Sequence, residues 1–341
     1  MQRTAAPRSD AATVRRFGIV LILGALALVG AFAIVAAFRP VAREGSTRVI
    51  TIPPGASVRE IAARLADARL IRSPVVFILA ARLRGVGGRL QHGEFALSPA
   101  MSTVEILDRI VRGEIVLHGI TIPEGYTAAR IADGLARAGL ADREEFLRLV
   151  REEGGSFPFA FLQGRRNLEG YLFPDTYRFP RDLPARQIIH QMLVRFDERV
   201  APELRARPPS PGVSLFEALI IASMVEREAK VAPERPIIAG VIYNRLQRGW
   251  RLEIDATILY ALGRHADRVT ASDLEVDSPY NTYRHGGLPP GPICNPGLAA
   301  IRAALRPATT PYLFYVLRPD GTHAFSRTYQ EHLQAIRRWR P

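Results

Sequence analysis

The residue best placed for acid–base chemistry is a glutamate at the end of a long apolar run. Ser214 and Glu217 have the spacing of a capping box, which predicts a helix from about Leu215 to Lys230. On this helix the carboxyl group of Glu228 lies over a stripe of large apolar side chains, namely Ile220, Ile221, Met224 and Val225. Apolar surroundings disfavour the charged form of a carboxyl group. We therefore expect the pKa of Glu228 to rise toward neutrality, where the group can act as a general acid and base.

A structural role is the alternative for Glu228. At the end of its helix it could be a solvated charge that pairs with Arg227, Lys230 or Arg235. Glu226 lies instead over smaller and more polar side chains, those of Leu219, Ala222 and Ser223. The stripe therefore favours Glu228 over Glu226 as the acid, and the ion-paired alternative stays open.

Two further segments carry side chains that suit sugar recognition, because carboxylates and amides hold hydroxyl groups and rings lie against pyranose faces. Glu169 and Tyr171 belong to an aromatic segment, residues 168–177, for which the edge of an apolar core is the alternative. Asn244 falls near the end of a second helix, predicted from about Pro233 to Arg248 and stopped by Gly249.

A third and a fourth segment follow that helix. Asp255 reads as the N-cap of a short helix through Tyr260, which makes capping at least as good an interpretation as catalysis. Tyr280, Asn281 and Tyr283 stand in a loop, residues 280–292, that is rich in Gly and Pro and therefore predicted to be rigid, exposed and able to line a cleft. A helix start at residues 295–297, a hairpin over residues 312–325 and a final helix complete the predicted catalytic part.

The composition is that of a folded protein without a cofactor motif. Hydrophobic residues make up 48% and charged residues 23%. The formal net charge is +13, yet Lys230 is the only lysine, so the excess is nearly all arginine. These arginines are scattered, which argues against a nucleic-acid partner. A single cysteine, Cys294, excludes an intramolecular disulfide and a cysteine-based zinc site. No metal cluster, P-loop or dinucleotide motif is found, and we expect no cofactor.

The first part of the chain is predicted to be a membrane anchor. Residues 17–38 carry no charge and, as a helix of roughly 33 Å, would cross a hydrocarbon core of about 30 Å. A cleaved signal peptide is the alternative. Residues 1–16 contain four arginines and one acidic residue, so the positive-inside rule makes them a cytoplasmic tail and places everything after Arg39 outside. The cell wall is abundant on that side, whereas ATP and nucleic acid are scarce.

An internal repeat follows the predicted anchor. Residues 50–62 reappear as residues 120–132, and a shorter echo spans residues 93–107. Each long copy reads as a strand, a turn with Pro and Gly, an N-cap at Ser57 or Thr127, and an amphipathic helix. This order resembles the LysM-type glycan-binding module, which implies binding to N-acetylglucosamine polymers. A generic strand–helix unit that packs against the catalytic domain is the alternative.

Several segments, in their order along the chain, closely resemble the endolytic murein transglycosylase family of YceG-like proteins. They are residues 168–177, 222–228, 244–246, Asp255, 280–283 and 287–291. In that family the second glutamate of the helix motif is taken as catalytic, and it corresponds to Glu228. The chain departs from the family pattern at Ala229, Glu253 and Ala256, where threonine, glutamine and proline are common.

The resemblance implies an α+β protein with a transmembrane helix at residues 17–38, a small LysM-like α+β module at residues 39–116 and a mixed α+β catalytic domain at residues 117–341. We assign substrate contacts to Glu169, Tyr171, Asn244, Asp255, Tyr280, Asn281 and Tyr283. The expected location is the inner membrane, as a single-pass protein with its N-terminus in the cytoplasm and its catalytic domain in the periplasm.

The implied reaction is endolytic cleavage of the β-1,4 bond between N-acetylmuramic acid and N-acetylglucosamine in peptidoglycan, without water. It leaves 1,6-anhydro ends, and the resemblance implies that it terminates nascent strands beside peptidoglycan synthases. One alternative is a hydrolase in which Asp255 or Glu169 is the second carboxylate. The other is a wall-binding scaffold in which Glu228 is structural.

Overall fold

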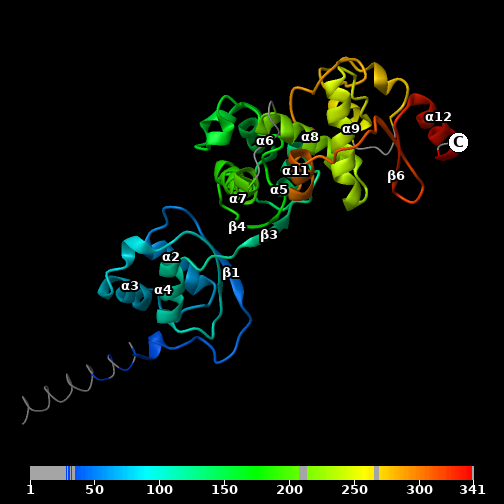
Figure 1. Ribbon diagram of the computed structural model, residues 1–341. Helices are drawn as coiled ribbons and strands as arrows, with labels where there is room; N and C mark the ends of the chain where they lie inside the picture. Colours follow the sequence, from blue (N-terminus) through cyan, green and yellow to red (C-terminus); the bar gives the residue numbers. More distant parts are fainter. Residues whose placement is uncertain are drawn as a thin grey trace, which may run out of the picture. The chain divides into compact units, whose positions relative to one another are not determined.

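The computed structural model describes residues 35–206, 213–264 and 269–339, with the isolated positions 28, 30 and 32. The predicted cytoplasmic tail and most of the predicted membrane segment lie outside the described residues, so both stay predictions. Within the described residues, no helix is long and apolar enough to cross a membrane. The chain forms two units, of which one ends at Leu117 and the other begins at His118 (Figure 1).

The first unit packs three helices against a two-stranded sheet. Its strands pair antiparallel, with Arg48 opposite Leu97 and Ile52 opposite Gly93. The elements are β1 (Arg48–Ile52), α2 (Val58–Asp67), α3 (Pro74–Leu83), the 3-10 turn η1 (Gly87–Arg89), β2 (Gly93–Leu97) and α4 (Thr103–Arg112). Apolar side chains from every helix and both strands, among them Phe77 and Phe95, form one buried core.

The second unit begins with another antiparallel pair, β3 (His118–Thr121) and β4 (Thr176–Phe179). Between these strands lie α5 (Ala128–Arg137), α6 (Arg143–Glu152) and the 3-10 turns η2 (Gly154–Ser156) and η3 (Ala160–Leu162). After β4 come α7 (Ala185–Ala206), α8 (Leu215–Glu228), η4 (Ala232–Glu234), α9 (Arg235–Gln247), α10 (Asp255–Ala261), η5 (Asp273–Glu275) and α11 (Leu298–Leu305). The hairpin β5 (Phe314–Leu317) and β6 (His323–Ser326) and the helix α12 (Tyr329–Trp339) complete it. The prediction of a mixed α+β protein is confirmed.

The sequence repeat corresponds to a repeated arrangement of elements. In each unit a strand is followed by two helices and then by a strand that pairs antiparallel with the first. In both copies a glycine with positive φ follows the first strand, at +76° for Gly55 and +77° for Gly125. The first helix is then capped by the hydroxyl of Ser57 or Thr127. The predicted order of strand, turn, cap and helix is thus confirmed in both copies, whereas glycan binding by them stays a prediction.

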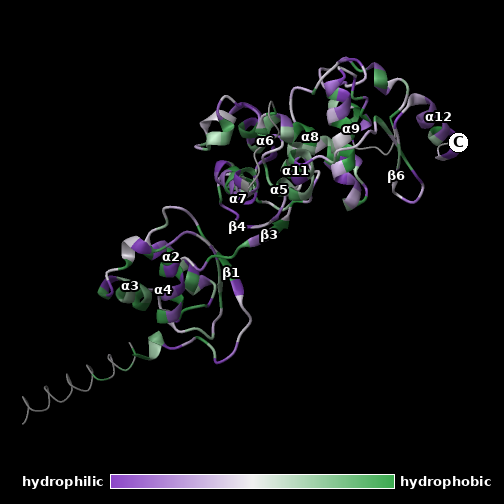
Figure 2. Cartoon of the chain, in the orientation of Figure 1, coloured by the Kyte–Doolittle hydropathy of each residue, from purple (hydrophilic) through white to green (hydrophobic). Residues whose placement is uncertain are grey.

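Helix α8 is the predicted helix that ends at Glu228. Its capping box is complete, because Glu217 N donates to Ser214 Oγ at 3.2 Å and Ser214 N donates to Glu217 Oε2 at 2.7 Å. Residues 218–225 are buried, and the helix packs against α9, α10 and α11. Figure 2 shows α8 and α11 as largely hydrophobic helices inside this unit. The core therefore fixes α8 along most of its length, and Glu228 lies at the end of this fixed helix.

We expect Ser214→Ala to destabilise the second unit, because the amide of Glu217 loses its side-chain acceptor. The loss of an N-cap costs about 1 kcal/mol, which corresponds to a thermal midpoint about 2–4 °C lower for a domain of this size. Calorimetry of the full chain measures this shift. Ser214→Asp is the matched control, since aspartate also accepts at an N-cap and should keep the midpoint. Equal loss in both variants would contradict a capping role.

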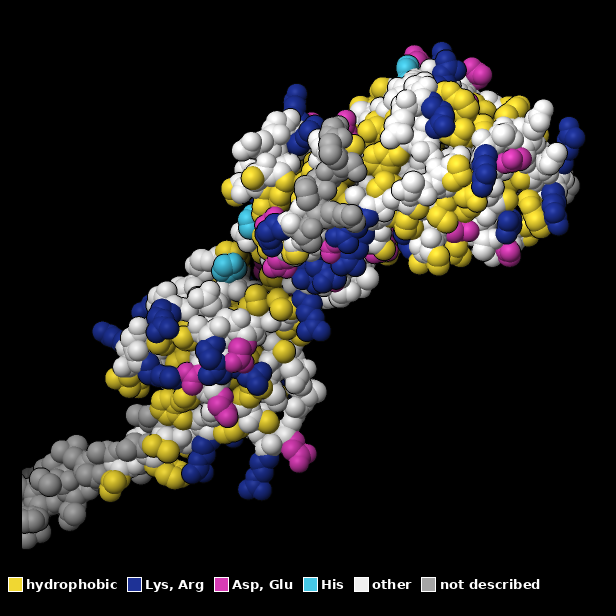
Figure 3. All heavy atoms as spheres, in the orientation of Figure 1, with side chains coloured by type: hydrophobic (Ala, Val, Ile, Leu, Met, Phe, Trp, Pro, Cys, Tyr) yellow, Lys and Arg dark blue, Asp and Glu magenta, His cyan; other side chains and the backbone are white. Residues whose placement is uncertain are grey.

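Most other predicted elements are confirmed. Helix α9 ends one residue before Arg248, and Gly249 follows with φ +69°. Residues 280–292 contain no helix or strand, α11 starts after Gly297, and the hairpin and final helix are present. The face in Figure 3 shows cationic and carboxylate side chains interspersed over both units.

The predicted capping role of Asp255 is wrong. Asp255 is the first residue of α10, and Ile254 at the N-cap position offers no side-chain bond. The amide of Ile254 donates to Oγ1 of Thr282, from the 280–292 loop, at 3.0 Å, and the amide of Ala256 in the first turn donates to Glu228. The carboxylate of Asp255 is therefore available for another partner.

Candidate active site

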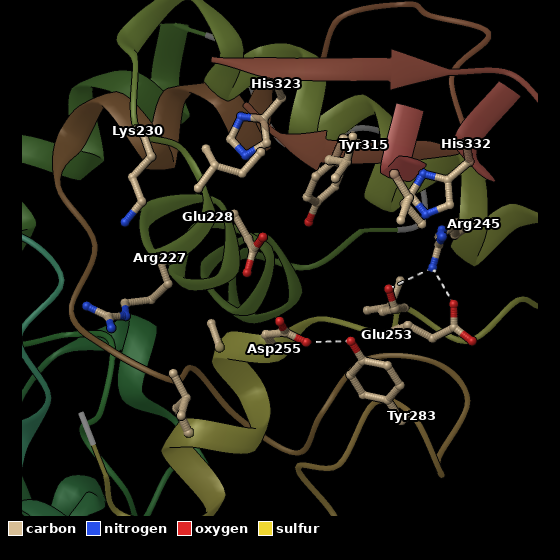
Figure 4. Close-up of a pocket in the computed structure, with 16 residues that line it drawn as sticks. Arg227, Glu228, Lys230, Arg245, Glu253, Asp255, Tyr283, Tyr315, His323 and His332 are labelled. Atoms are coloured by element: carbon tan, nitrogen blue, oxygen red, sulfur yellow. Dashed lines mark hydrogen bonds and ion pairs between the residues drawn. The ribbon is translucent and has the colours of Figure 1, made fainter. Parts of the chain in front are cut away.

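A cavity of 640 Å³ opens over the last turn of α8 (Figure 4). Its volume lies in the range of small-ligand sites. It is lined from the ends of α8 and α9, the start of α10, the 280–292 loop, the β5–β6 hairpin and α12. Its polar side chains are Arg227, Glu228, Lys230, Arg245, Glu253, Asp255, Tyr283, Tyr315, His323 and His332. We call this space the Glu228 cavity.

Glu228 is half-buried at the C-terminal end of α8 and faces this cavity. Burial, and next the negative charge of Asp255, raise its pKa to about 7. Hydrogen bonds from the Tyr315 hydroxyl and the Ala256 amide, together with the charge of Lys230, act in the opposite direction. A carboxyl group with this pKa is present in both protonation states near neutral pH, as an acid that later acts as a base requires.

Glu226, the competing glutamate, has a different setting. Burial raises its pKa as well, but its carboxylate accepts from Gly297 N at 3.0 Å and lies 3.7 Å from the guanidinium of Arg235. It does not line the Glu228 cavity. Arg235, one of the partners considered for Glu228, thus pairs with Glu226 instead.

Tyr315 and His323 come from the β5–β6 hairpin and were not singled out in the sequence. Burial and the charge of Glu228 keep the pKa of Tyr315 well above its usual value, so its hydroxyl stays protonated and can donate to Glu228. The Nδ1 atom of His323 lies 2.6 Å from Glu234 Oε2, and the amide of His323 donates to Glu234 Oε1 at 2.9 Å. This buried pair joins the hairpin to the segment before α9.

Asp255 and Tyr283 form the opposite wall. The Tyr283 hydroxyl donates to Asp255 Oδ1 at 2.5 Å, which orients the carboxylate within the same cavity as Glu228 (Figure 4). Of the three carboxyl groups that line the cavity, that of Glu228 has a pKa of about 7, that of Asp255 accepts from a phenol, and that of Glu253 is the third. Asp255 and Tyr283, both predicted to contact substrate, thus line the Glu228 cavity.

Arg245 holds the backbone next to this wall. Its Nε donates to Leu313 O at 2.7 Å and its NH1 group donates to Leu252 O at 2.9 Å. It also pairs with Glu253 at 3.1 Å. Glu253 has a φ of +51°, a region that is costly for residues other than glycine, and such strain concentrates at functional sites. Two of the three departures from the family pattern, Glu253 and Ala256, therefore line the cavity.

Four of the predicted substrate-binding residues have structural contacts instead. Tyr171 is 1% exposed and packs against Phe161 and Phe196, so its ring has no surface for a sugar. The side-chain amide of Asn244 donates to Thr310 O and Tyr312 O. The remaining two, Asn281 and Tyr280, support the 280–292 loop: Asn281 donates to Leu274 O and Val276 O, and the Tyr280 ring lies 4.9 Å from that of Tyr260. None of these four residues lines the Glu228 cavity.

Glu169 is separated from Glu228. It is 6% exposed and accepts from Ala128 N at 3.0 Å and from Asn295 Nδ2 at 2.8 Å. Burial raises its pKa to about 7. It lines a second cavity, not the one that holds Glu228. Of the two candidates for a second carboxylate, only Asp255 shares the Glu228 cavity.

The described residues contain no group of three or more His, Cys, Asp or Glu side chains that could hold a metal ion. Cys294 is buried, and burial raises the pKa of its thiol well above the usual value. The site is thus built from carboxyl, phenol, imidazole and cationic groups.

Residues 50–338 match the YceG-like family. A Bacillus subtilis protein named endolytic murein transglycosylase is 35% identical over 314 residues, which cover 87% of this chain and 86% of that protein. A Streptococcus pneumoniae protein of the same name is 32% identical over 313 residues, which cover 83% of this chain and 56% of the longer relative. The crystal structure of a putative yceG-like protein from Listeria monocytogenes, 34% identical, matches 85% of this chain and 99% of that one with a TM-score of 0.58. This chain therefore belongs to the YceG-like family.

Proposed function

We propose that the chain is an endolytic lytic transglycosylase of peptidoglycan, with Glu228 as its acid and base. The observation that carries the proposal is a half-buried carboxyl group with a pKa of about 7 that faces a cavity large enough for a sugar. The names of the relatives in Bacillus and Streptococcus support the same substrate.

In the proposed reaction Glu228 first gives its proton to the oxygen of the β-1,4 bond as the bond to C1 of the muramic acid breaks. The carboxylate then takes the proton of the 6-hydroxyl of the same sugar while that oxygen bonds to C1. The product is a 1,6-anhydro end, and Glu228 is again protonated. Because the nucleophile belongs to the substrate, one carboxyl group suffices. The Tyr315 hydroxyl would hold the carboxylate between the two steps.

A hydrolase is the second candidate, and the observation that favours it is the position of Asp255 in the same cavity as Glu228. In that reaction Asp255 would activate water or stabilise the positive sugar, as the second carboxylate of ordinary glycosidases does.

Product analysis separates the two reactions. We expect the full chain, incubated with uncrosslinked glycan strands in water labelled with heavy oxygen, to release internal fragments with unlabelled 1,6-anhydro ends. Mass spectrometry reads both the end group and the label. Labelled reducing ends would establish hydrolysis instead, and no fragments at all would favour a wall-binding protein.

The location and role follow from the same proposal. Residues 17–38 would anchor the chain in the inner membrane, with the described residues outside and within reach of strands as synthases make them. Cutting there would terminate nascent strands. Protease added to cells with a permeabilised outer membrane should digest the second unit, and recovery of an intact chain would count against this topology.

A further inference from the structure

A second cavity, of 420 Å³, adjoins the Glu228 cavity. The start of α5, the helix α6, the segment before β4 and the end of α10 line it. Arg227, Ala256 and Leu259 line both cavities, so the two spaces meet beside the last turn of α8. We call this space the α5–α6 cavity.

The α5–α6 cavity is rich in positive charge. Among the described residues that line it are five arginines, Arg130, Arg143, Arg151, Arg227 and Arg264, against two acids, Asp133 and Glu169. Two of these arginines are held by aspartates, since Arg143 pairs with Asp133 at 2.6 Å and Arg264 with Asp273. The pKa of about 7 also leaves Glu169 only partly ionised near neutral pH. The lining thus has more cationic than acidic side chains, which favours an anionic ligand.

A comparison of the two repeat copies singles out Arg130. In the first copy the third residue of α2 is Glu60, which completes a capping box by accepting from Ser57 N at 2.7 Å. The corresponding residue of α5 is Arg130. A cation in the first turn opposes the helix dipole, which is unfavourable for stability. Its guanidinium lies 3.9 Å over the ring of Tyr126 and lines the cavity.

The carboxylate that α5 lacks comes from outside the repeat. Glu169 accepts from Ala128 N with both oxygens, at 3.0 and 3.1 Å, and so serves the start of α5. The start of α5 therefore still has a carboxylate, that of Glu169, although residue 130 is a cation. The arrangement fits a role for Arg130 in binding a ligand better than a role in stabilising α5.

We propose that the α5–α6 cavity binds the carboxylate-bearing peptide that branches from muramic acid, through Arg130, Arg151 and Arg227. The inference rests on the proposed function. The peptide branches from the sugar whose bond to the next residue is cut, and Arg227 directly precedes Glu228 in α8 while lining both cavities. The chain therefore selects strands that still carry their peptides over strands from which the peptides have been removed.

The test compares two substrates on the full-length chain, namely uncrosslinked strands with their peptides and the same strands after removal of the peptides by an amidase. We expect the wild type to show a kcat/KM about tenfold higher on the first substrate, the effect of one charge-assisted hydrogen bond. The variant Arg130→Ala/Arg151→Ala should bring the ratio of the two values to about one. High salt should also bring the wild-type ratio closer to one, because it screens the charges.

Arg148→Ala is the matched control. Arg148 lies on the same helix as Arg151, pairs with Glu153 and lines neither cavity, so its replacement should keep the wild-type ratio. If the double variant does not fold, as judged from its thermal midpoint, Arg151→Ala alone is used, because Arg151 is exposed. A wild-type ratio near one, or the same ratio in wild type and variant, overturns the inference.

A binding measurement separates this inference from the proposed function. Calorimetry with a soluble tetrapeptide of the wall sequence should detect binding to Glu228→Gln, and loss of that binding when Arg151→Ala is added. If neither strand is cut by the wild type but the peptide binds in this way, the proposed function fails, and only peptide binding by the α5–α6 cavity stands. If strands are cut without preference and the peptide does not bind, the inference fails and the function stands.

Discussion

Replacing Glu228 by glutamine should lower the rate of strand cleavage by about 10²- to 10⁴-fold, the usual contribution of a general acid and base. Glutamine has nearly the same shape and keeps an oxygen that can accept the hydrogen bond of Tyr315, but it has no proton to give. The fold should be unchanged. Initial rates of fragment release from uncrosslinked strands, followed by mass spectrometry, measure the effect.

Glu226→Gln is the control for this substitution. Glu226 lies two residues earlier on α8 and also has a pKa raised by burial, but it faces Gly297 and lines neither cavity. Its amide analogue can still accept from Gly297 N, so this variant should cleave strands near the wild-type rate. Loss of activity in Glu226→Gln with activity retained in Glu228→Gln would reverse the assignment.

The parts of the site that sequence could predict depend on local periodicity. The capping box at Ser214 and the apolar stripe of α8 set the start, the buried face and the end of this helix within a single segment. The repeat likewise revealed two strand–helix units, because each is encoded by a contiguous run with its own turn and cap. Such signals do not require knowledge of what packs against the segment.

The residues that the sequence did not reveal depend on contacts between distant segments. Tyr315 and His323 reach the Glu228 cavity only because the hairpin near the C-terminus folds over the end of α8. Asp255 is the first residue of α10 and not its cap, and the amide of Ile254 before it donates to Thr282 from another loop. Tyr171 has the composition of a sugar-binding residue, yet packing of α7 places its ring in the core against Phe196. Residue type alone does not tell an exposed ring from a buried one.

Cleavage should fall as pH rises through the pKa of Glu228, which burial and the charge of Asp255 raise to about 7. The acid must be protonated to release the leaving sugar, so its active form is lost above this pKa. The rate should then fall about tenfold per pH unit, and so about 100-fold two units above it. The dependence of kcat/KM on pH, measured on one substrate at constant ionic strength, shows this limb for the free enzyme. A limb near the ordinary pKa of glutamate, or none up to pH values well above 7, would contradict a raised pKa at the reacting group.

Asp255→Asn tells whether Asp255 acts through Glu228 or on the substrate. Asparagine can still accept from the Tyr283 hydroxyl but carries no charge, so one of the causes that raise the pKa of Glu228 is removed. If Asp255 only tunes the acid, the descending limb moves to lower pH and the rate below the new limb is restored. If Asp255 is instead the second carboxylate of a hydrolase, the rate falls at every pH and no shift of the limb restores it. The same carboxylate thus connects the protonation state of Glu228 to the choice between transglycosylation and hydrolysis.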